Sequence, residues 1–301
     1  MSSPALGSAR RPWLLLAPTL VVLGVLLLWP LGRVVVLSMQ DFGLGQLVRG
    51  DADFVWFQNY RDVLTNERLW LVALPNTVVF AFVCVVLTVV LGTLVALLLQ
   101  QLRPLWRSLV MMTIMAAWAI PAVTGTYVWV YLFDARAGFL TGVMANLGLI
   151  DLATQNLFLD RFWFYAIATL NVVHHGFPFV AVTVLAALLT IPQDLPEAAM
   201  IDGANAWQRF RHITLPLLKP VFAIVTILST IWDFKVFTQI YLMPGGDGSN
   251  REVLNLGTWS YITAMSQNRY GLGAAIAVLL TLLLMVITVI YLRTLFKEEE
   301  S

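Results

Sequence analysis

Long apolar runs alternate with short charged stretches along the chain. Windows of more than 20 residues without Asp, Glu, Lys or Arg lie between Arg11 and Arg33, Arg68 and Arg103, Arg107 and Asp134, Arg161 and Asp194, and Arg269 and Arg293. A helix that crosses the hydrocarbon core of a bilayer needs about 20 mostly apolar residues. Each window therefore predicts a membrane-spanning helix.

A sixth apolar run extends from Leu217 to Met243 and contains Lys219, Asp233 and Lys235. Charged residues inside a span usually have a function, so we count this run as a span too. The first run has no small-residue cleavage site, and it is longer than the apolar core of about 7–15 residues in a signal peptide, so we expect it to remain in the mature protein. The predicted spans are 12–37, 72–100, 108–133, 162–190, 217–243 and 271–293, in one transmembrane domain covering residues 1–301.

Composition agrees with a protein embedded in lipid. Of the 301 residues, 59% are hydrophobic and 12% are charged, whereas soluble domains have about 25% charged residues. The net charge of +1 gives no reason to expect nucleic acid as a partner. The single cysteine, Cys84, lies in an apolar run, so we expect a buried core residue and no disulfide or thiolate metal site. The chain also has no phosphate-binding loop motif, which predicts that it binds no nucleotide itself.

Six spans place both termini on the same side of the membrane. The side with the termini has nine Lys and Arg residues, and the other has seven, which share their loops with ten acidic residues. Positive residues favour the cytoplasm. We therefore expect a multi-pass protein with both termini in the cytoplasm.

The loop between the fourth and fifth spans, residues 191–216, predicts a short helix, a break and a second short helix. Asp194 and Glu197 have the spacing of a capping box. Gly203 is suited to the left-handed residue that ends a helix. The charge count favours the cytoplasmic side for this loop by a small margin.

The second helix of this loop is expected to be capped by Asn205 and to stop at Pro216 and Pro220. In the first helix, Ala198 and Ala199 lie between two acids, and such small residues allow close approach to a partner. The alternative is a helix lying on the lipid headgroups. Helices of that kind are normally rich in Lys and Arg, and the first half of this one has neither.

The same loop matches a family motif. Glu197-Ala198-Ala199, then Gly203, and after nine residues Ile213, Leu215 and Pro216, fit the pattern E-A-A-x3-G-x9-I-x-L-P. In this the chain resembles the membrane subunits of binding-protein-dependent ABC importers. Further matches are similar to the carbohydrate branch (maltose/glycerol-3-phosphate type) and its first permease subunit: Asp202 to Phe210, Trp29-Pro30, Asn59-Tyr60, Asn76-Thr77, Pro121-Ala122-Val123 and Lys235-Val236-Phe237.

The resemblance implies an all-α integral membrane fold, the six-transmembrane-helix type I ABC importer permease with a cytoplasmic coupling helix. It implies a non-catalytic permease subunit, in the bacterial inner membrane, of an ATP-driven importer for a sugar or sugar-like solute. The implied partners are a second homologous permease subunit, two copies of a cytoplasmic ATPase that uses ATP and Mg, an extracytoplasmic sugar-binding protein, and membrane lipid. The implied ATPase-coupling residues are Glu197, Ala198, Ala199, Asp202, Gly203, Arg209, Ile213, Leu215 and Pro216.

A neutral sugar needs hydrogen-bonding groups and an aromatic platform along its pathway. The candidate pathway residues are Trp129, Asn171, His174, His175, Trp232, Asp233, Lys235 and Gln239. Two alternatives stay open, because charged residues of the fifth span can snorkel to the outer interface and Trp residues commonly anchor in the headgroup region. Departures from the family pattern at the His pair, Asp233 and Thr238 leave the identity of the substrate open.

Two other function classes compete with this interpretation. A secondary transporter or channel acting without an ATPase often has discontinuous helices and inverted repeats, but it has no use for a coupling loop. An integral membrane enzyme should have convergent His, Asp or Glu side chains near one membrane face, whereas here these residues are scattered.

Overall fold

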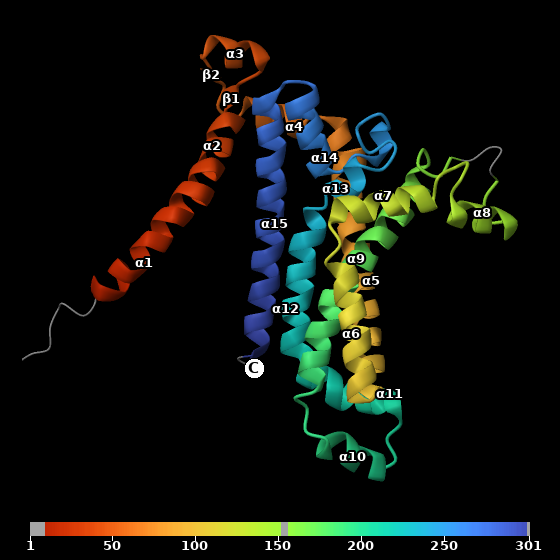
Figure 1. Cartoon of the computed structure of the whole chain (residues 1–301). Coiled ribbons are helices and arrows are strands. Elements are labelled where there is room, and N and C mark those ends of the chain that lie inside the picture. The colour runs from red at the N-terminus through yellow and green to blue at the C-terminus, as the bar shows by residue number, and fades with distance from the viewer. Residues whose placement is uncertain (1–9, 152–155, 300–301) are drawn as a thin grey trace, which may run out of the picture. The chain divides into compact units, whose positions relative to one another are not determined.

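The structure is a computed structural model, and it describes residues 10–151 and 156–299. Five helices in this part of the chain are long and apolar enough to cross a membrane, Leu15–Ser38, Leu69–Gln101, Arg161–Leu188, Ala206–Tyr241 and Tyr270–Arg293. Helices Pro104–Trp118 and Ala122–Leu132 form a sixth candidate that is bent by 90°. The all-α membrane fold expected from the apolar runs is confirmed (Figure 1).

The described chain divides into two compact units. The first comprises residues up to 66 together with 260–280. Its elements are α1 (Arg10–Leu23), a π turn (Gly24–Leu28), α2 (Trp29–Ser38), β1 (Gln40–Asp41), α3 (Leu44–Arg49), β2 (Asp53–Phe54), α4 (Gln58–Leu64), a π turn (Ile262–Ser266) and the first part of α15 (Tyr270–Glu299).

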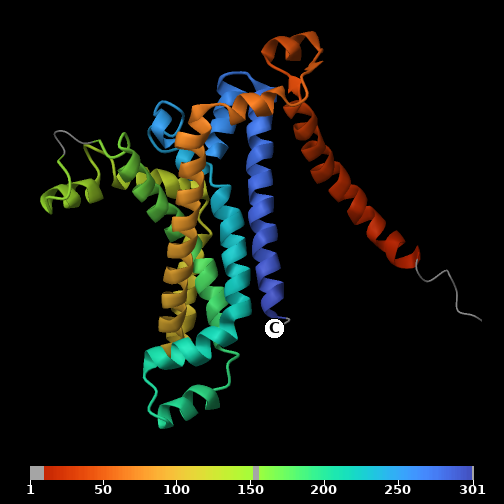
Figure 2. The same cartoon turned by 180° about the vertical axis from the view of Figure 1, so that it is seen from behind.

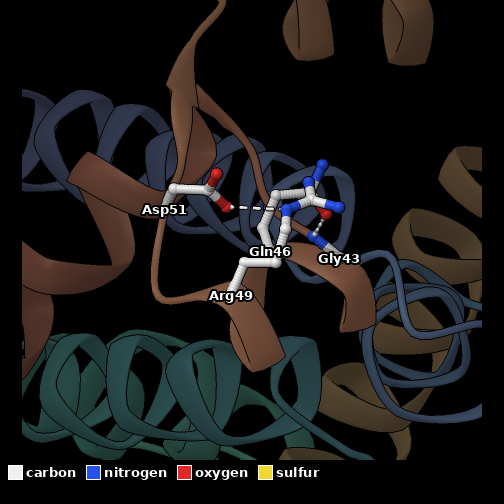
Figure 3. Close-up of polar contacts among 4 residues, drawn as sticks. All are labelled: Gly43, Gln46, Arg49 and Asp51. Carbon is white, nitrogen blue, oxygen red and sulfur yellow. Dashed lines mark hydrogen bonds and ion pairs between the residues drawn. The ribbon is translucent and has the colours of Figure 1, made fainter.

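Polar contacts fold the segment after α2 onto its neighbours in the first unit. The Asn59 side chain donates hydrogen bonds to the carbonyls of Ser38 and Gln40, both at 2.9 Å. Strands β1 and β2 pair antiparallel. Figure 3 shows the α3 connection between these strands, where the Arg49 guanidinium lies 3.2 Å from Asp51. Because that ion pair is exposed, it adds little stability, and the buried Asn59 amide is the stronger constraint.

The second unit comprises residues 67–259 and those from 281 onward. Its elements are a π turn (Leu69–Ala73), α5 (Leu74–Gln101), α6 (Pro104–Trp118), α7 (Ala122–Leu132), α8 (Phe139–Asn146), α9 (Arg161–Leu188), α10 (Asp194–Ile201), α11 (Ala206–Arg209), a π turn (Phe210–Thr214), α12 (Leu215–Phe234), α13 (Thr238–Tyr241) and a 3-10 turn (Arg251–Val253). Helix α14 (Leu256–Tyr261) and the rest of α15 complete the described chain.

Helices α5, α9 and α12 pack against one another and form the core of the second unit (Figures 1 and 2). Small residues bring α5 and α9 close together, as is common where membrane helices pack. A side chain at Gly92 would place its Cβ 2.6 Å from the Cβ of Val180. Cys84 is fully buried in this core, as the apolar run around it predicts.

The start of α5 is tied to the segment before α14 by buried amides and hydroxyls. The Asn76 side chain donates to the carbonyls of Glu252 and Leu254 at 2.8 Å, and its own carbonyl accepts from Arg161 Nε at 3.0 Å. The adjacent Thr77 hydroxyl accepts from the main chain at 2.9 Å. Buried polar groups need hydrogen-bond partners. These bonds therefore give Asn76 and Thr77 a structural role, which is to hold the start of α5 against the segment before α14.

Prolines shape the spans in two ways. The expected span 108–133 breaks before Pro121, because proline lacks an N–H group and disfavours helical backbone in the residue before it. Pro30, Pro75 and Pro216 instead each follow a π turn, and the residue before each proline donates its N–H to the carbonyl five residues back. The wider turn moves the carbonyl that the proline ring would strike in a regular helix, so these helices continue.

Candidate functional site

The loop of residues 191–216 lies at one end of α5, α9 and α12 and contains α10 and α11 (Figures 1 and 2). The capping box expected at Asp194 and Glu197 is wrong. Helix α10 begins one residue earlier, with Gln193 as its N-cap and with no side-chain cap bond among the described residues. Both acids therefore lie in the first turn, where negative charge is favourable near the helix N-terminus.

The end of α10 agrees with the prediction. Gly203 has φ +85°, which is the left-handed region. The Ala204 N–H donates to the Ala199 carbonyl at 2.9 Å, and the Gly203 N–H donates to the Met200 carbonyl at 3.1 Å. This is the Schellman arrangement, and it turns the chain sharply after the helix.

The second helix is capped as predicted but does not stop where we expected. The Asn205 and Gln208 side chains each accept a hydrogen bond from the other residue's main-chain N–H, at 2.9 and 2.8 Å. The chain then continues through the π turn into α12, so the expected stop at Pro216 and Pro220 is wrong. The π turn accommodates Pro216, and the loop is thereby continuous with the fifth span.

The exposed surface of α10, the turn after it and the start of α11 combines acids with large apolar side chains. Glu197, Ala198 and Asp202 are exposed. Beside them in the chain, Ile201 is 88% exposed and Trp207 is 64% exposed. Sequence reasoning missed these two apolar residues, although an Ile and a Trp in a polar loop are themselves a signal of a buried interface.

The remaining loop residues lie elsewhere. Ile213 is half-buried and, with Arg209, lines a cavity of about 330 Å³ that also borders the end of α5. Arg209 donates from Nη1 to the Ala204 carbonyl at 2.8 Å, which fastens α11 to the turn. Leu215 and Pro216 are exposed on α12. The predicted loop residues therefore divide into a largely exposed set on α10 and the turn after it, the half-buried Arg209 and Ile213, and the exposed Leu215 and Pro216 on α12.

The membrane-embedded candidates converge on a second cavity, of about 310 Å³, between α9 and the end of α12. Five of the eight predicted pathway residues line it: His175, Trp232, Asp233, Lys235 and Gln239. Trp118 and Phe237 also line it and were missed, because only the bend after α6 and the end of α12 bring them there.

The other three candidates lie outside this lining, on α7 and α9. The buried Asn171 amide donates to the Thr126 hydroxyl at 3.2 Å. The ring of Trp129 lies 5.9 Å from that of the exposed His174, centroid to centroid. Asn171 thus has a partner already, while the Trp129 and His174 rings form a separate aromatic contact.

Asp233 and Lys235 differ in their surroundings. Helix α12 ends at Phe234, so Asp233 lies in its last turn and Lys235 follows it. Asp233 is only 8% exposed, and its Oδ2 has no hydrogen-bond partner within the described part of the chain. Lys235 is exposed, and no ion pair joins the two described side chains. A buried carboxylate oxygen without a donor is costly.

Comparisons with known proteins agree with this architecture. Residues 88–297 match the family described as binding-protein-dependent transport system inner membrane component. The diacetylchitobiose uptake system permease protein DasB of Streptomyces coelicolor is 39% identical over 97% of this chain and 89% of its own. The trehalose/maltose transport system permease protein MalF of Thermococcus litoralis is 32% identical over 95% of this chain and 93% of its own.

A solved structure shares the fold. A chain of a bacterial ABC transporter involved in the import of the acidic polysaccharide alginate matches with a TM-score of 0.77 at 21% identity. The match covers 95% of this chain and 96% of that one. At this identity the likeness concerns the arrangement of helices alone.

Proposed function

Because the chain belongs to the family of binding-protein-dependent transport system inner membrane components, we propose that it is a permease subunit of an ATP-driven importer of a sugar or sugar-like solute. Relatives named for the uptake of diacetylchitobiose and of trehalose or maltose support the solute class. The cavity beside α12 supports it too, since it combines two Trp rings with several hydrogen-bonding side chains. Aromatic faces pack on the apolar face of a sugar, and polar groups bind its hydroxyls.

The single observation that carries this function is the exposed surface formed by α10, the turn after it and the start of α11. Ile201 and Trp207 leave apolar area uncovered beside the carboxylates of Glu197 and Asp202. Such a surface fits a protein partner with an apolar cleft and a cationic rim. We propose that the partner is a cytoplasmic ATPase and that α10 is the coupling helix. This places the loop and both chain termini in the cytoplasm, with the terminal residues themselves outside the described ranges.

The rest of the assembly follows from this role. One chain provides part of the pathway wall, and a second, homologous permease subunit provides the remainder. Two ATPase copies use ATP and Mg and change the spacing of the coupling helices, while an extracytoplasmic binding protein delivers the solute. Solute then passes the 310 Å³ cavity lined by His175, Trp232, Asp233, Lys235 and Gln239, close to Trp129, Asn171 and His174.

Reconstitution tests the proposal. The chain is purified with the products of neighbouring genes and assayed in proteoliposomes for uptake of diacetylchitobiose, trehalose and maltose, with and without ATP. We expect an ATPase to co-purify and uptake of at least one sugar to require both ATP and the binding protein. Uptake by this chain without an ATPase would refute the coupling role.

A further inference from the structure

We propose, on the basis of the sugar-import function above, that Asp233 selects solutes that present an N–H group, an ammonium or an amide, to the cavity between α9 and α12. Asp233 is 8% exposed, lines this cavity, and has an Oδ2 atom without a partner in the described residues. A solute that donates a hydrogen bond to the Asp233 carboxylate compensates a group whose burial without a donor costs free energy. The cavity volume of about 310 Å³ is within the usual range for small-molecule sites.

The position of Asp233 in its helix strengthens the preference for a donor. Asp233 lies in the last turn of α12, which ends at Phe234. The C-terminal end of a helix carries partial negative charge, so it disfavours a carboxylate and favours a cation nearby. The Asp233 carboxylate and the C-terminal end of α12 therefore both favour a solute with a positive charge or a hydrogen-bond donor in the cavity.

No ion pair in the described part of the chain neutralises the Asp233 carboxylate in this cavity. Lys235 lines the cavity but is exposed and forms no ion pair with Asp233 in the described structure. His175, on α9, is half-buried on the same lining. A hydrogen bond with one ionised partner is about twice as strong as a neutral one. An ammonium also gains charge–charge attraction to the carboxylate, which an amide lacks, so an ammonium gains most and an amide gains less. A solute carboxylate at the same place would repel Asp233.

Cysteine labelling measures occupancy of this cavity without relying on transport. Thr238 lines the cavity and is half-buried, while the natural Cys84 is fully buried. In a Thr238→Cys variant of the complete complex in nanodiscs, a thiosulfonate reagent therefore reports on the new thiol. Modification is quantified by mass spectrometry on the peptide of this chain. Labelling without sugar shows that each variant leaves the cavity open.

Three disaccharides with the same linkage differ only in the group at issue: chitobiose has amines, diacetylchitobiose has amides and cellobiose has hydroxyls. We expect chitobiose to protect the thiol at a concentration about tenfold lower than cellobiose, a difference of about 1.4 kcal/mol, with diacetylchitobiose between them. Asp233→Asn should remove this advantage while changing protection by cellobiose less than about twofold. Asp62→Asn, which removes an exposed carboxylate, should change nothing.

The selectivity is overturned, with sugar import left intact, by equal protection by the amine and hydroxyl sugars or by a ranking that Asp233→Asn does not alter. Strongest protection by cellobiuronic acid would likewise overturn it and assign recognition to Lys235. If no disaccharide protects the thiol and none is taken up with ATP, the proposed function itself fails. If Asp233→Asn does not assemble, Asp233→Ser takes its place, and equal protection by the amine and hydroxyl sugars with Asp233 intact overturns the selectivity without either variant.

Discussion

At the scale of single residues, the most constrained position of the loop is Gly203. Its φ of +85° is strained for any residue with a Cβ, although a Cβ there would meet no atom within 4 Å. The penalty is therefore one of backbone conformation and not of packing.

We expect Gly203→Ala to destabilise the turn by about 1 kcal/mol and Gly203→Val by more, since β-branched residues tolerate positive φ least. ATP-dependent uptake should fall in the same order at equal amounts of complex in the membrane. Equal uptake by the two variants would show that the turn is not held in this conformation during transport.

Residue types predicted local backbone conformation better than they predicted contacts between residues far apart in the sequence. Gly203 and Asn205 act within five residues of themselves, so the sequence contains what determines their conformation. The unpartnered oxygen of Asp233 depends instead on where α12 ends and on how α9 packs against it. Sequence showed a charge inside a span, but it could not show whether that charge is buried or snorkels.

At the scale of helices, long apolar runs without charged residues predicted the spans, while hydrogen bonding around prolines decided their continuity. The same residue type breaks the chain before Pro121 and is accommodated after a π turn at Pro216. The choice depends on whether the preceding turn can widen against its neighbours, which is a property of the packed helix. The two short helices of the loop are present, but the stop expected at Pro216 and Pro220 was wrong for this reason.

The π turn before Pro216 also sets the orientation of α11 relative to α12. Pro216→Ala restores an N–H group, which allows the i to i−4 bond and favours a regular helix. Tightening the turn rotates α11 by up to about 100°, one residue of helix, and should reduce uptake per ATP hydrolysed several-fold while the complex still assembles. Pro220→Ala, which has no π turn before it, serves as the matched control and should change this ratio less.

At the scale of the whole molecule, the exposed side chains of α10 are expected to be covered in the assembly. Glu197→Lys reverses a charge at this surface and would place like charges together against a cationic cleft, which can cost several kcal/mol. We expect the variant to reach the membrane, to co-purify less ATPase and to lose at least about tenfold of ATP-dependent uptake. Asp194→Lys, on the same turn of α10 but outside the matched motif, is the control for charge reversal. Uptake at the unaltered level in Glu197→Lys would contradict the coupling role.

The π turns have a genetic consequence. A turn closed by a bond to the fifth residue back holds one residue more than a regular helical turn closed at the fourth. Relative to a homologue with a regular helix at the same place, we therefore expect one extra codon before each of Pro30, Pro75 and Pro216. When a homologue has another residue in place of such a proline, a regular helical turn can form there. The extra residue is then no longer needed, and deletion of one codon in the preceding turn should be tolerated. Proline and codon are thus expected to be gained and lost together.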